Sequence, residues 1–330
     1  MEKRMAILEI TMLFLGSIIG AGFATGAELM TFFGKFHLPI CFIALIVGGT
    51  MFFMITFEIL LFYPQKQQTQ SPNHHKKYKI FLDVVIVMIY LILFTAMTAG
   101  IAKITNPIIC LISLVISTTV VLFGINHLSR FNLYVMIIII TLIITTALPH
   151  LPTKSTTAKS IWIYTPQLTL WALLYAGLNC FMFPELIHAS AQKHKRHTLL
   201  FAGLFTAFLV TVLIALIIAT IYDTNTQDAS IPLLAAAPNY ITTIIILLAI
   251  LTSQYTTLFA TFQRIQKIIP KTQSKPLLTT TCICLFALLG SLLGFNRIIQ
   301  FGYPIIGAIT CFYLLFSFLT KLWRLFQHHY

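Results

Sequence analysis

The sequence predicts an all-α polytopic membrane protein whose ten transmembrane helices form two inverted repeats of five, with the first and sixth helices broken. Three observations support this prediction. Of the 330 residues 58% are hydrophobic and 9% are charged, whereas soluble globular proteins contain about 25% charged residues. The apolar residues gather in segments long enough to cross a bilayer. The first and sixth segments also contain helix-breaking residues at corresponding positions.

Ten apolar segments account for most of the chain, at roughly 20 residues for each membrane crossing. They run over residues 5–34, 39–63, 80–102, 107–123, 131–148, 166–190, 198–221, 240–263, 276–294 and 300–320. Only His127 and Arg130 mark the boundary between the fourth and fifth segments. The predicted organisation is a first repeat over 1–148, an external linker over 149–165, a second repeat over 166–320 and a cytoplasmic tail over 321–330.

The basic residues predict the orientation, because cytoplasmic loops of membrane proteins are enriched in Lys and Arg. With a cytoplasmic N-terminus, all of the 21 basic residues fall inside except Lys35, Lys103, Lys154, Lys159 and Arg297. Both termini are therefore predicted to be cytoplasmic. Topology also accounts for the net charge of +13, so we do not expect a nucleic-acid partner. The six cysteines lie within predicted spans and show no disulfide or zinc spacing.

The second five segments match the first five in order. Because five is an odd number of crossings, the second copy must be inverted in the membrane. The longest connections agree with this inversion. The basic loop over 64–79 is predicted to be internal, and its counterpart over 222–239 contains Asp223 and Asp228 without any Lys or Arg, so it is predicted to be external.

Glycines interrupt the first segment near its middle. Gly16, Gly20, Gly22 and Gly26 fall close together, and each costs roughly 1 kcal/mol relative to Ala inside a helix. We therefore expect an unwound segment over 20–26 between two half-helices, over 6–19 and 27–33. Backbone groups released at membrane depth must be satisfied by protein, water or a ligand.

The sixth segment shows a similar disruption, with Gly177, Asn179 and Pro184 close together. Proline removes a backbone donor and clashes with the preceding turn of a helix. Two interrupted spans at corresponding positions of inverted halves are typical of the central site of a transporter. The alternative is structural, since Gly and Pro are common in membrane helices generally.

The residues from Gly20 to Glu28 read Gly-Ala-Gly-Phe-Ala-Thr-Gly-Ala-Glu. With the five-plus-five pattern, this sequence resembles the amino acid–polyamine–organocation (APC) superfamily, which has the LeuT fold. Within it the sequence is most similar to the YkvI-type bacterial membrane proteins, whose first helix has a similar signature. The resemblance extends over essentially the whole chain, and it implies a transporter in the bacterial cytoplasmic (inner) membrane.

The resemblance also implies a sodium site. Its ligands would be backbone carbonyls of Gly16, Ile19 and Ala249 and the hydroxyls of Thr252 and Ser253, a set of oxygens that suits a hard cation. Alternatively, the two hydroxyls bond to carbonyls one turn earlier. Proton-coupled relatives often have a lysine in the fifth helix, and residues 131–148 contain none, which favours sodium. No other cofactor is predicted.

The substrate site is predicted to lie between the two breaks. Backbone N–H groups of Ala21, Gly22 and Phe23 would face a carboxylate, and carbonyls over 176–179 would receive an ammonium group. For the aromatic residues ordinary packing is an alternative. The full set of predicted substrate-binding residues is Gly20, Ala21, Gly22, Phe23, Thr25, Gly26, Tyr90, Tyr175, Gly177, Asn179 and Phe181.

Acidic residues inside membrane segments are costly and invite a role. Glu28 follows the first break and Glu185 follows Pro184, and both are candidates for a gate or a proton carrier. Glu28 is alternatively a structural anchor, and Glu185 is expected to pair with His188 or Lys193. The remaining acids near cytoplasmic ends are expected to reach the interface or pair with loop lysines; they are Glu9, Glu58 and Asp83.

These features predict a secondary active transporter of a small amino acid or related solute, coupled to sodium, that works by alternating access. Two alternatives stay open: coupling to protons, and a sensor on the same scaffold that binds a solute without transporting it. An enzyme is not expected, because the sequence shows no nucleophile with a base, no metal cluster and no phosphate loop. The expected partners are the small-molecule substrate and the bilayer, and the oligomeric state is open.

Overall fold

The computed structural model describes residues 2–36, 38–64, 76–150 and 161–327, which form α-helices joined by short loops and contain no β-strand. The helices are α1 (Glu2–Ile18), α2 (Ala21–Thr25), α3 (Ala27–Phe33), α4 (Ile40–Phe62), α5 (Lys76–Ile104), α6 (Pro107–Leu122), α7 (Ile125–Ala147), α8 (Ile161–Cys180), α9 (Phe183–Ala191), α10 (Arg196–Asp223), α11 (Pro232–Ala236), α12 (Tyr240–Ile268), α13 (Pro276–Ser291), α14 (Phe295–Arg297) and α15 (Tyr303–Gln327).

Within the described ranges, six helical stretches are long and apolar enough to cross a membrane, and a seventh is formed if the bent pair α8 and α9 counts as one span. The six are Ile40–Phe62, Leu82–Ile104, Ile125–His150, Arg196–Asp223, Tyr240–Ile268 and Phe295–Trp323. The chain is therefore a multi-pass membrane protein. The helices α6 and α13 are apolar but have only 16 residues each, so the ten-helix arrangement stays a prediction.

Several helices extend beyond the predicted apolar segments. The helix α7 begins at Ile125, so His127 and Arg130 lie inside it and not between spans. Gly124, at φ 83°, makes the turn before it, in the left-handed region that glycine adopts readily. The helix α15 continues through Gln327, so most of the predicted tail is helical. The helices extend past the predicted segments because apolar runs mark the lipid core, whereas helices continue with polar residues outside it. Residues 151–160 of the predicted linker lie outside the described residues.

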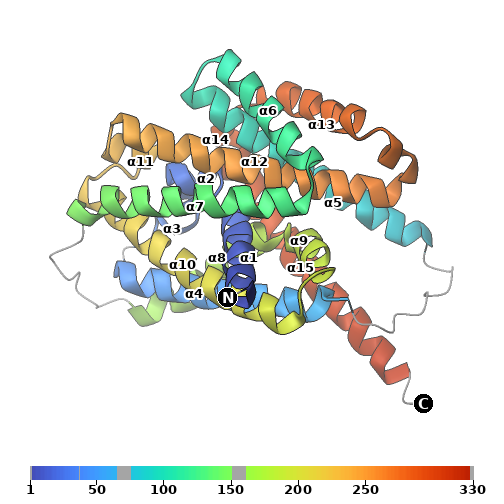
Figure 1. Cartoon of the computed structure of the whole chain (residues 1–330). Coiled ribbons are helices and arrows are strands. Elements are labelled where there is room, and N and C mark those ends of the chain that lie inside the picture. The colour runs from blue at the N-terminus through green and yellow to red at the C-terminus, as the bar shows by residue number, and fades with distance from the viewer. Residues whose placement is uncertain (1, 37, 65–75, 151–160, 328–330) are drawn as a thin grey trace.

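The interior of the bundle is built around α1 and α12. Residues 10–26 are all buried, and so are residues 252–262 of α12. A helix that is buried all round belongs in the middle of a structure, and Figure 1 shows α1 in the middle of the molecule. The helices α6 and α13 lie together at one edge, and both expose large apolar side chains such as Val115 and Leu289.

Close packing of α4 against α10 leads to a first prediction. A Cβ atom added at Gly48 would collide with the side chain of Thr211, whereas one added at the neighbouring Gly49 would meet nothing within 4 Å. We expect Gly48→Ala to lower the free energy of unfolding by about 1 to 3 kcal/mol, because overpacking forces the helices apart. Thermal unfolding in detergent would measure the change.

Gly49→Ala is the matched control, since it adds the same methyl group one residue further along the same helix. It should be neutral or stabilising by up to about 1 kcal/mol, because Ala favours the helix more than Gly does. Equal destabilisation by the two substitutions would contradict the packing that we describe between α4 and α10.

Candidate functional site

The predicted break in the first span is present between α1 and α3. The N–H of Gly20 donates to the carbonyl of Ile18 at 2.9 Å, and not to the carbonyl of Gly16, which it would reach in a continuous helix. A second interruption follows at Gly26, which has a left-handed φ of 76°. Both interruptions coincide with glycines that the sequence singled out.

The segment between these two interruptions is not fully unwound, contrary to the prediction for residues 20–26. Its middle forms the short helix α2, in which the Thr25 hydroxyl donates to the Ala21 carbonyl at 2.7 Å. The N–H of Ala21 points at the sulfur of Met97 on α5, at 3.2 Å. A helical turn satisfies backbone groups that would otherwise be left without partners away from water.

The sixth predicted span is interrupted between α8 and α9, which meet at an angle of 49°. Pro184 lies in the first turn of α9, where its missing N–H costs no hydrogen bond. The carbonyl of Phe181, in the break itself, accepts a hydrogen bond from the Tyr90 hydroxyl at 3.3 Å. The rings of Tyr90 and Phe181 also meet edge to face, with centroids 5.1 Å apart.

The two breaks are joined by a hydrogen bond between Glu28 and Asn179. The Asn179 amide donates to Glu28 Oε1 at 2.9 Å, and the same nitrogen also donates to the Tyr175 carbonyl at 3.0 Å. Glu28 is only 3% exposed. Its other oxygen lies against Gly22, where an added Cβ would approach Glu28 Oε2 to 2.5 Å. Glu28 therefore fills the space between the two interrupted helices.

Two buried tyrosine hydroxyls next to this pair have no hydrogen-bond partner in the described part of the chain. They belong to Tyr175 of α8 and Tyr303 of α15, and both groups interact electrostatically with Glu28. An added Cβ at Gly22 would lie 3.1 Å from the Tyr303 ring. Sequence reasoning missed Tyr303, because one tyrosine after a glycine in an apolar segment is indistinguishable from a packing residue. These unpaired hydroxyls can bond to a ligand.

The structure does not bring all of the predicted substrate residues to this point. Gly177 faces α15, where an added Cβ would lie 2.9 Å from both the Gly307 carbonyl oxygen and the Cys311 sulfur. Gly26 packs against Ile221 and Pro232, so it closes the side of the break towards α11. Phe23 is fully buried.

The predicted sodium ligands lie where α1 meets α12. The Ser253 hydroxyl is buried without a partner, and it lies 2.9 Å from a Cβ added at Gly20. The Thr252 hydroxyl donates to the Ala249 carbonyl at 2.8 Å, as in the structural alternative. The Gly16 carbonyl, like that of Ile19 beyond it, lies at the break, where the helix hydrogen-bond pattern is interrupted.

One residue beside the predicted ion ligands was not anticipated. An added Cβ at Gly16 would lie 2.7 Å from the side-chain nitrogen of Asn132 on α7, and this nitrogen has no partner. The oxygen of Asn132 accepts a hydrogen bond from Tyr255 of α12. The sequence offered little signal, because Asn132 belongs to a stretch that was predicted to pack as an ordinary span.

Glu185 forms a different ion pair from those expected. Its oxygens contact Arg264 at 2.6 Å and Lys267 at 2.5 Å, both on α12, and Arg264 also contacts Asp83 of α5 at 2.8 Å. The expected partner Lys193 donates to Asn126 instead. The prediction was wrong because it chose partners that are close to Glu185 in the sequence. The bend between α8 and α9 instead places α9 beside α12, where Arg264 and Lys267 lie.

Glu58 also contradicts its prediction. It was expected to reach the interface or a loop lysine, but it is fully buried and neither carboxyl oxygen has a partner. Its position one turn before the end of α4 suggested exposure, yet α8, α9 and α10 pack around this helix. By contrast, Glu9 is partly exposed on α1, in agreement with the prediction.

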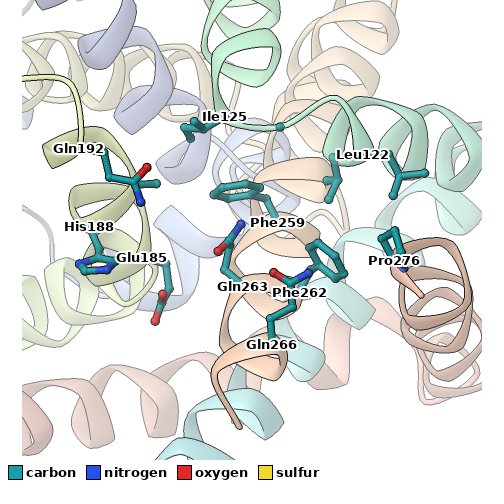
Figure 2. A pocket seen from close by; sticks show the side chains of 13 residues that line it. Leu122, Ile125, Glu185, His188, Gln192, Phe259, Phe262, Gln263, Gln266 and Pro276 are labelled. Carbon is teal, nitrogen blue, oxygen red and sulfur yellow. The ribbon is translucent and has the colours of Figure 1, made fainter. Parts of the chain in front are cut away.

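A cavity of about 260 Å³ lies between α9, α12 and the corner between α6 and α7. Figure 2 shows side chains from the α9 region and from α12 facing the same space, among them His188 of α9, Gln192 directly after α9 and Gln263 of α12. Glu185 lines the same cavity. The cavity therefore opens beside the Glu185 ion pairs, at the end of the bundle where α12 ends.

A metal centre built from the usual side chains is not found in the part of the chain that the structure describes. No three residues among His, Cys, Asp and Glu are grouped closely enough there to hold a metal ion. The oxygens available near the breaks are backbone carbonyls, hydroxyls and the Glu28 carboxyl, which suit an alkali-metal ion better than zinc.

The fold is one that occurs in membrane transporters. The structure is similar to that of the manganese transporter of Eremococcus coleocola, with a TM-score of 0.54 and 10% sequence identity over 94% of this chain and 78% of that chain. In sequence, the chain is similar to the uncharacterized membrane protein YkvI of Bacillus subtilis (strain 168), with 22% identity over 328 residues and 92% of each chain covered. No protein-family model matches the chain.

The contact between Glu28 and Asn179 leads to a second prediction. We expect the double variant Glu28→Ala with Asn179→Ala to lose less stability than the two single variants added together. Each single change leaves the other polar group buried without this partner. The interaction free energy should be about 0.5 to 3 kcal/mol, as measured by denaturation of the purified variants.

Thr141→Ala on α7 is the control for this cycle, because its hydroxyl is exposed and bonds only to the Ile137 carbonyl of the same helix. Combined with Glu28→Ala, it should be additive to within about 0.5 kcal/mol. Additive effects in the Glu28 and Asn179 cycle itself would show that the two breaks are not coupled through this hydrogen bond.

The ion pairs of Glu185 lead to a third prediction. Arg264 and Glu185 are 11% and 2% exposed, whereas Lys267 is 41% exposed. Arg264→Met should lower the free energy of unfolding by about 3 to 5 kcal/mol, because it leaves carboxylates buried with less compensation. Lys267→Met should cost less than about 1 kcal/mol, because water screens this contact. Denaturation would measure both, and equal losses would contradict the assignment.

Proposed function

We propose that this chain is a secondary active transporter of a small amino acid or a related carboxylate-bearing solute, working by alternating access around the two breaks. The observation that carries the proposal is the buried polar centre where the interrupted helices meet. It contains Glu28, Asn179 and the unpaired hydroxyls of Tyr175 and Tyr303. Buried polar groups without partners are costly, and a ligand with its own donors and acceptors would satisfy them. The role proposed is non-enzymatic.

We propose the ten-helix, five-plus-five LeuT-like arrangement of the APC superfamily as the architecture. It requires α6 and α13 to cross the membrane, and at 1.5 Å per residue helices of 16 residues are about 24 Å long. The segments α1 to α3 would form the remaining broken span. The interruptions at Gly20 and Phe181 then occupy corresponding positions in the two halves, which supports the inverted repeat.

The chemistry at the centre favours a zwitterion over a divalent metal. Glu28 offers a carboxyl to an ammonium group, and the backbone N–H groups of Gly22 and Phe23 lie in the first turn of α2, where a carboxylate is favoured. Manganese, the cargo named for the similar transporter, is not proposed here, because Glu28 is the only acidic residue among those that we place at this centre.

Sodium is the coupling ion that we propose, bound by the carbonyls of Gly16, Ile19 and Ala249 and the hydroxyls of Thr252 and Ser253. The unpaired Ser253 hydroxyl supports this, as does the interrupted hydrogen-bond pattern at Gly16. Hard cations prefer such oxygens.

The cavity beside α9 and α12 supports alternating access. It lies at the end of the bundle that the basic residues predict to be cytoplasmic. On the other side of the break, Gly26 is covered by Ile221 and by Pro232 of α11. This arrangement corresponds to a conformation in which the break is covered on the predicted external side, while a cavity lies on the predicted cytoplasmic side.

Uptake by proteoliposomes tests the proposal, with a radiolabelled mixture of the protein amino acids as the probe. We expect accumulation with an inward sodium gradient and none when choline replaces sodium. Ser253→Ala should raise the sodium concentration for half-maximal uptake by about tenfold, the effect of losing about 1.4 kcal/mol of ion binding. Gly22→Ala should lower uptake, because the added methyl group displaces Glu28.

Two matched controls accompany these variants. Thr261→Ala removes a hydroxyl two turns further along α12, where it donates to the Thr257 carbonyl, and it should leave the sodium dependence unchanged. Gly49→Ala should leave uptake unchanged. Binding of an amino acid, seen as thermal stabilisation, without accumulation would indicate a sensor. If accumulation is the same with and without sodium, and the same in the wild type and in Gly22→Ala, the proposed substrate and sodium sites are refuted.

A further inference from the structure

Glu58 is a buried carboxyl group that the proposed transport site does not use. It lies on α4 and is 0% exposed, and neither of its oxygens has a hydrogen-bond partner among the residues that the structure describes. This distinguishes it from Glu28, which accepts from Asn179, and from Glu185, which contacts two cations. An ionised carboxylate in such a place would lose its hydration without compensation. Burial without a partner therefore favours the protonated form of Glu58 in this conformation.

Within the part of the chain that the structure describes, no charged side chain bonds to the Glu58 carboxyl oxygens. The titratable groups that interact with it electrostatically are Tyr90 of α5, Cys180 of α8 and Cys311 and Tyr313 of α15, all of them neutral in their protonated forms. The helix α10 also packs on α4, and its ionisable side chains are Arg196 and His197 in the first turn and Tyr222 and Asp223 in the last turn.

The cation Lys321 of α15 donates to the Leu60 and Leu61 carbonyls at the end of α4, and two further cations, Arg264 and Lys267, are paired with carboxylates. Tyr90 and Tyr313 connect the surroundings of Glu58 to Arg264, with which both interact. Arg264 and Lys267 face two carboxylates, those of Asp83 and Glu185, so the four charges sum to zero. The helix α9 contributes Glu185 to this balanced set, and His188 lines the cavity beside it. Among the described residues, no cation therefore pairs with the Glu58 oxygens, and an ionised Glu58 would have no counter-ion in contact with it.

Glu58 lies on a helix that contacts the joint between α8 and α9. Two turns before it on α4, the sulfur of Met51 lies 4.0 Å from the Cys180 sulfur, at the end of α8. The break between α8 and α9 follows directly, with its 49° bend. Glu58 thus lies on the helix that packs against this joint. A change in the bend that brought water or Arg264 to the carboxyl would favour loss of the proton.

We propose that Glu58 is a proton-binding site of the transport cycle, protonated in the conformation described and deprotonated when the joint between α8 and α9 opens. The ligand of this site is a proton, which leaves the carboxyl oxygen as the ionised form gains water or Arg264. The inference rests on the proposed transport function, and it adds a second coupling ion to sodium. Low pH then favours the conformation with Glu58 buried.

The first arm of the test is infrared spectroscopy of the full chain in vesicles of phosphatidylethanolamine and phosphatidylglycerol at neutral pH. We expect the wild type to show the carbonyl stretch of a protonated carboxylic acid. In both Glu58→Gln and Glu58→Leu, the intensity of this band should fall by the contribution of one carboxylic acid group. The control Glu9→Gln, a partly exposed acid on α1, should leave the band intact. A band that is unchanged in both Glu58 variants would overturn the proposal.

The second arm is transport, with the radiolabelled mixture of the protein amino acids as the probe. A gradient of one pH unit without a sodium gradient should give up to about tenfold accumulation in the wild type for one proton per solute. Glu58→Gln should give none, yet it should still exchange labelled for unlabelled amino acid. Accumulation by Glu58→Gln equal to that of the wild type would overturn the coupling role.

The two arms separate this inference from the proposed function. If the wild type neither accumulates nor exchanges any amino acid under either gradient, the transport function fails, and the coupling role of Glu58 fails with it. If the wild type exchanges amino acids but the pH gradient drives no accumulation, transport stands and the proton coupling alone is refuted.

Discussion

The structure depends on one constraint, which is that backbone N–H and C=O groups released inside a membrane must find partners in the protein. Both interrupted spans meet this constraint with groups from other helices. The Met97 sulfur receives the N–H of Ala21, and the Tyr90 hydroxyl donates to the Phe181 carbonyl. Each break is therefore stabilised by a side chain of α5.

The same constraint explains how the two breaks become one site. The Asn179 amide weakens α8 as a helix and donates to Glu28, which follows the first break. A single hydrogen bond thus joins residues that are 151 positions apart. Around it, Gly22 leaves room for the carboxyl, and the Tyr175 and Tyr303 hydroxyls remain available to a ligand.

Two of the few acidic residues of the chain belong to one ion-pair network. The chain has only 8 acidic residues, and two of them, Asp83 and Glu185, share Arg264 at the end of the bundle where the cavity lies. This network ties α5, α9 and α12 together beside the cavity, so opening the bundle at this end requires the ion pairs to rearrange. Glu58 is not part of this network, and its oxygens have no partner among the described residues.

Much of the fold and part of the site could be predicted from local chemistry. Glycines at positions 20 and 26 and the cluster around Pro184 located the interruptions, because their effect on a helix is a property of the residues themselves. The partners could not be predicted in the same way. Glu185 was assigned to His188 or Lys193 by proximity in sequence, and Tyr303 and Asn132 could not be distinguished from the many other polar residues of apolar segments.

The sequence by itself determined that the chain is a helical membrane protein, where its spans are interrupted and which acids lie near the interruptions. These properties follow from hydropathy and backbone preference, which act over a few residues. Only the tertiary structure decided that Arg264 pairs with Glu185, that Gly177 faces α15 and that Glu58 is enclosed. The physical reason is that burial and ion pairing depend on which helices pack together, and a helix of uniform hydrophobicity does not specify its neighbours.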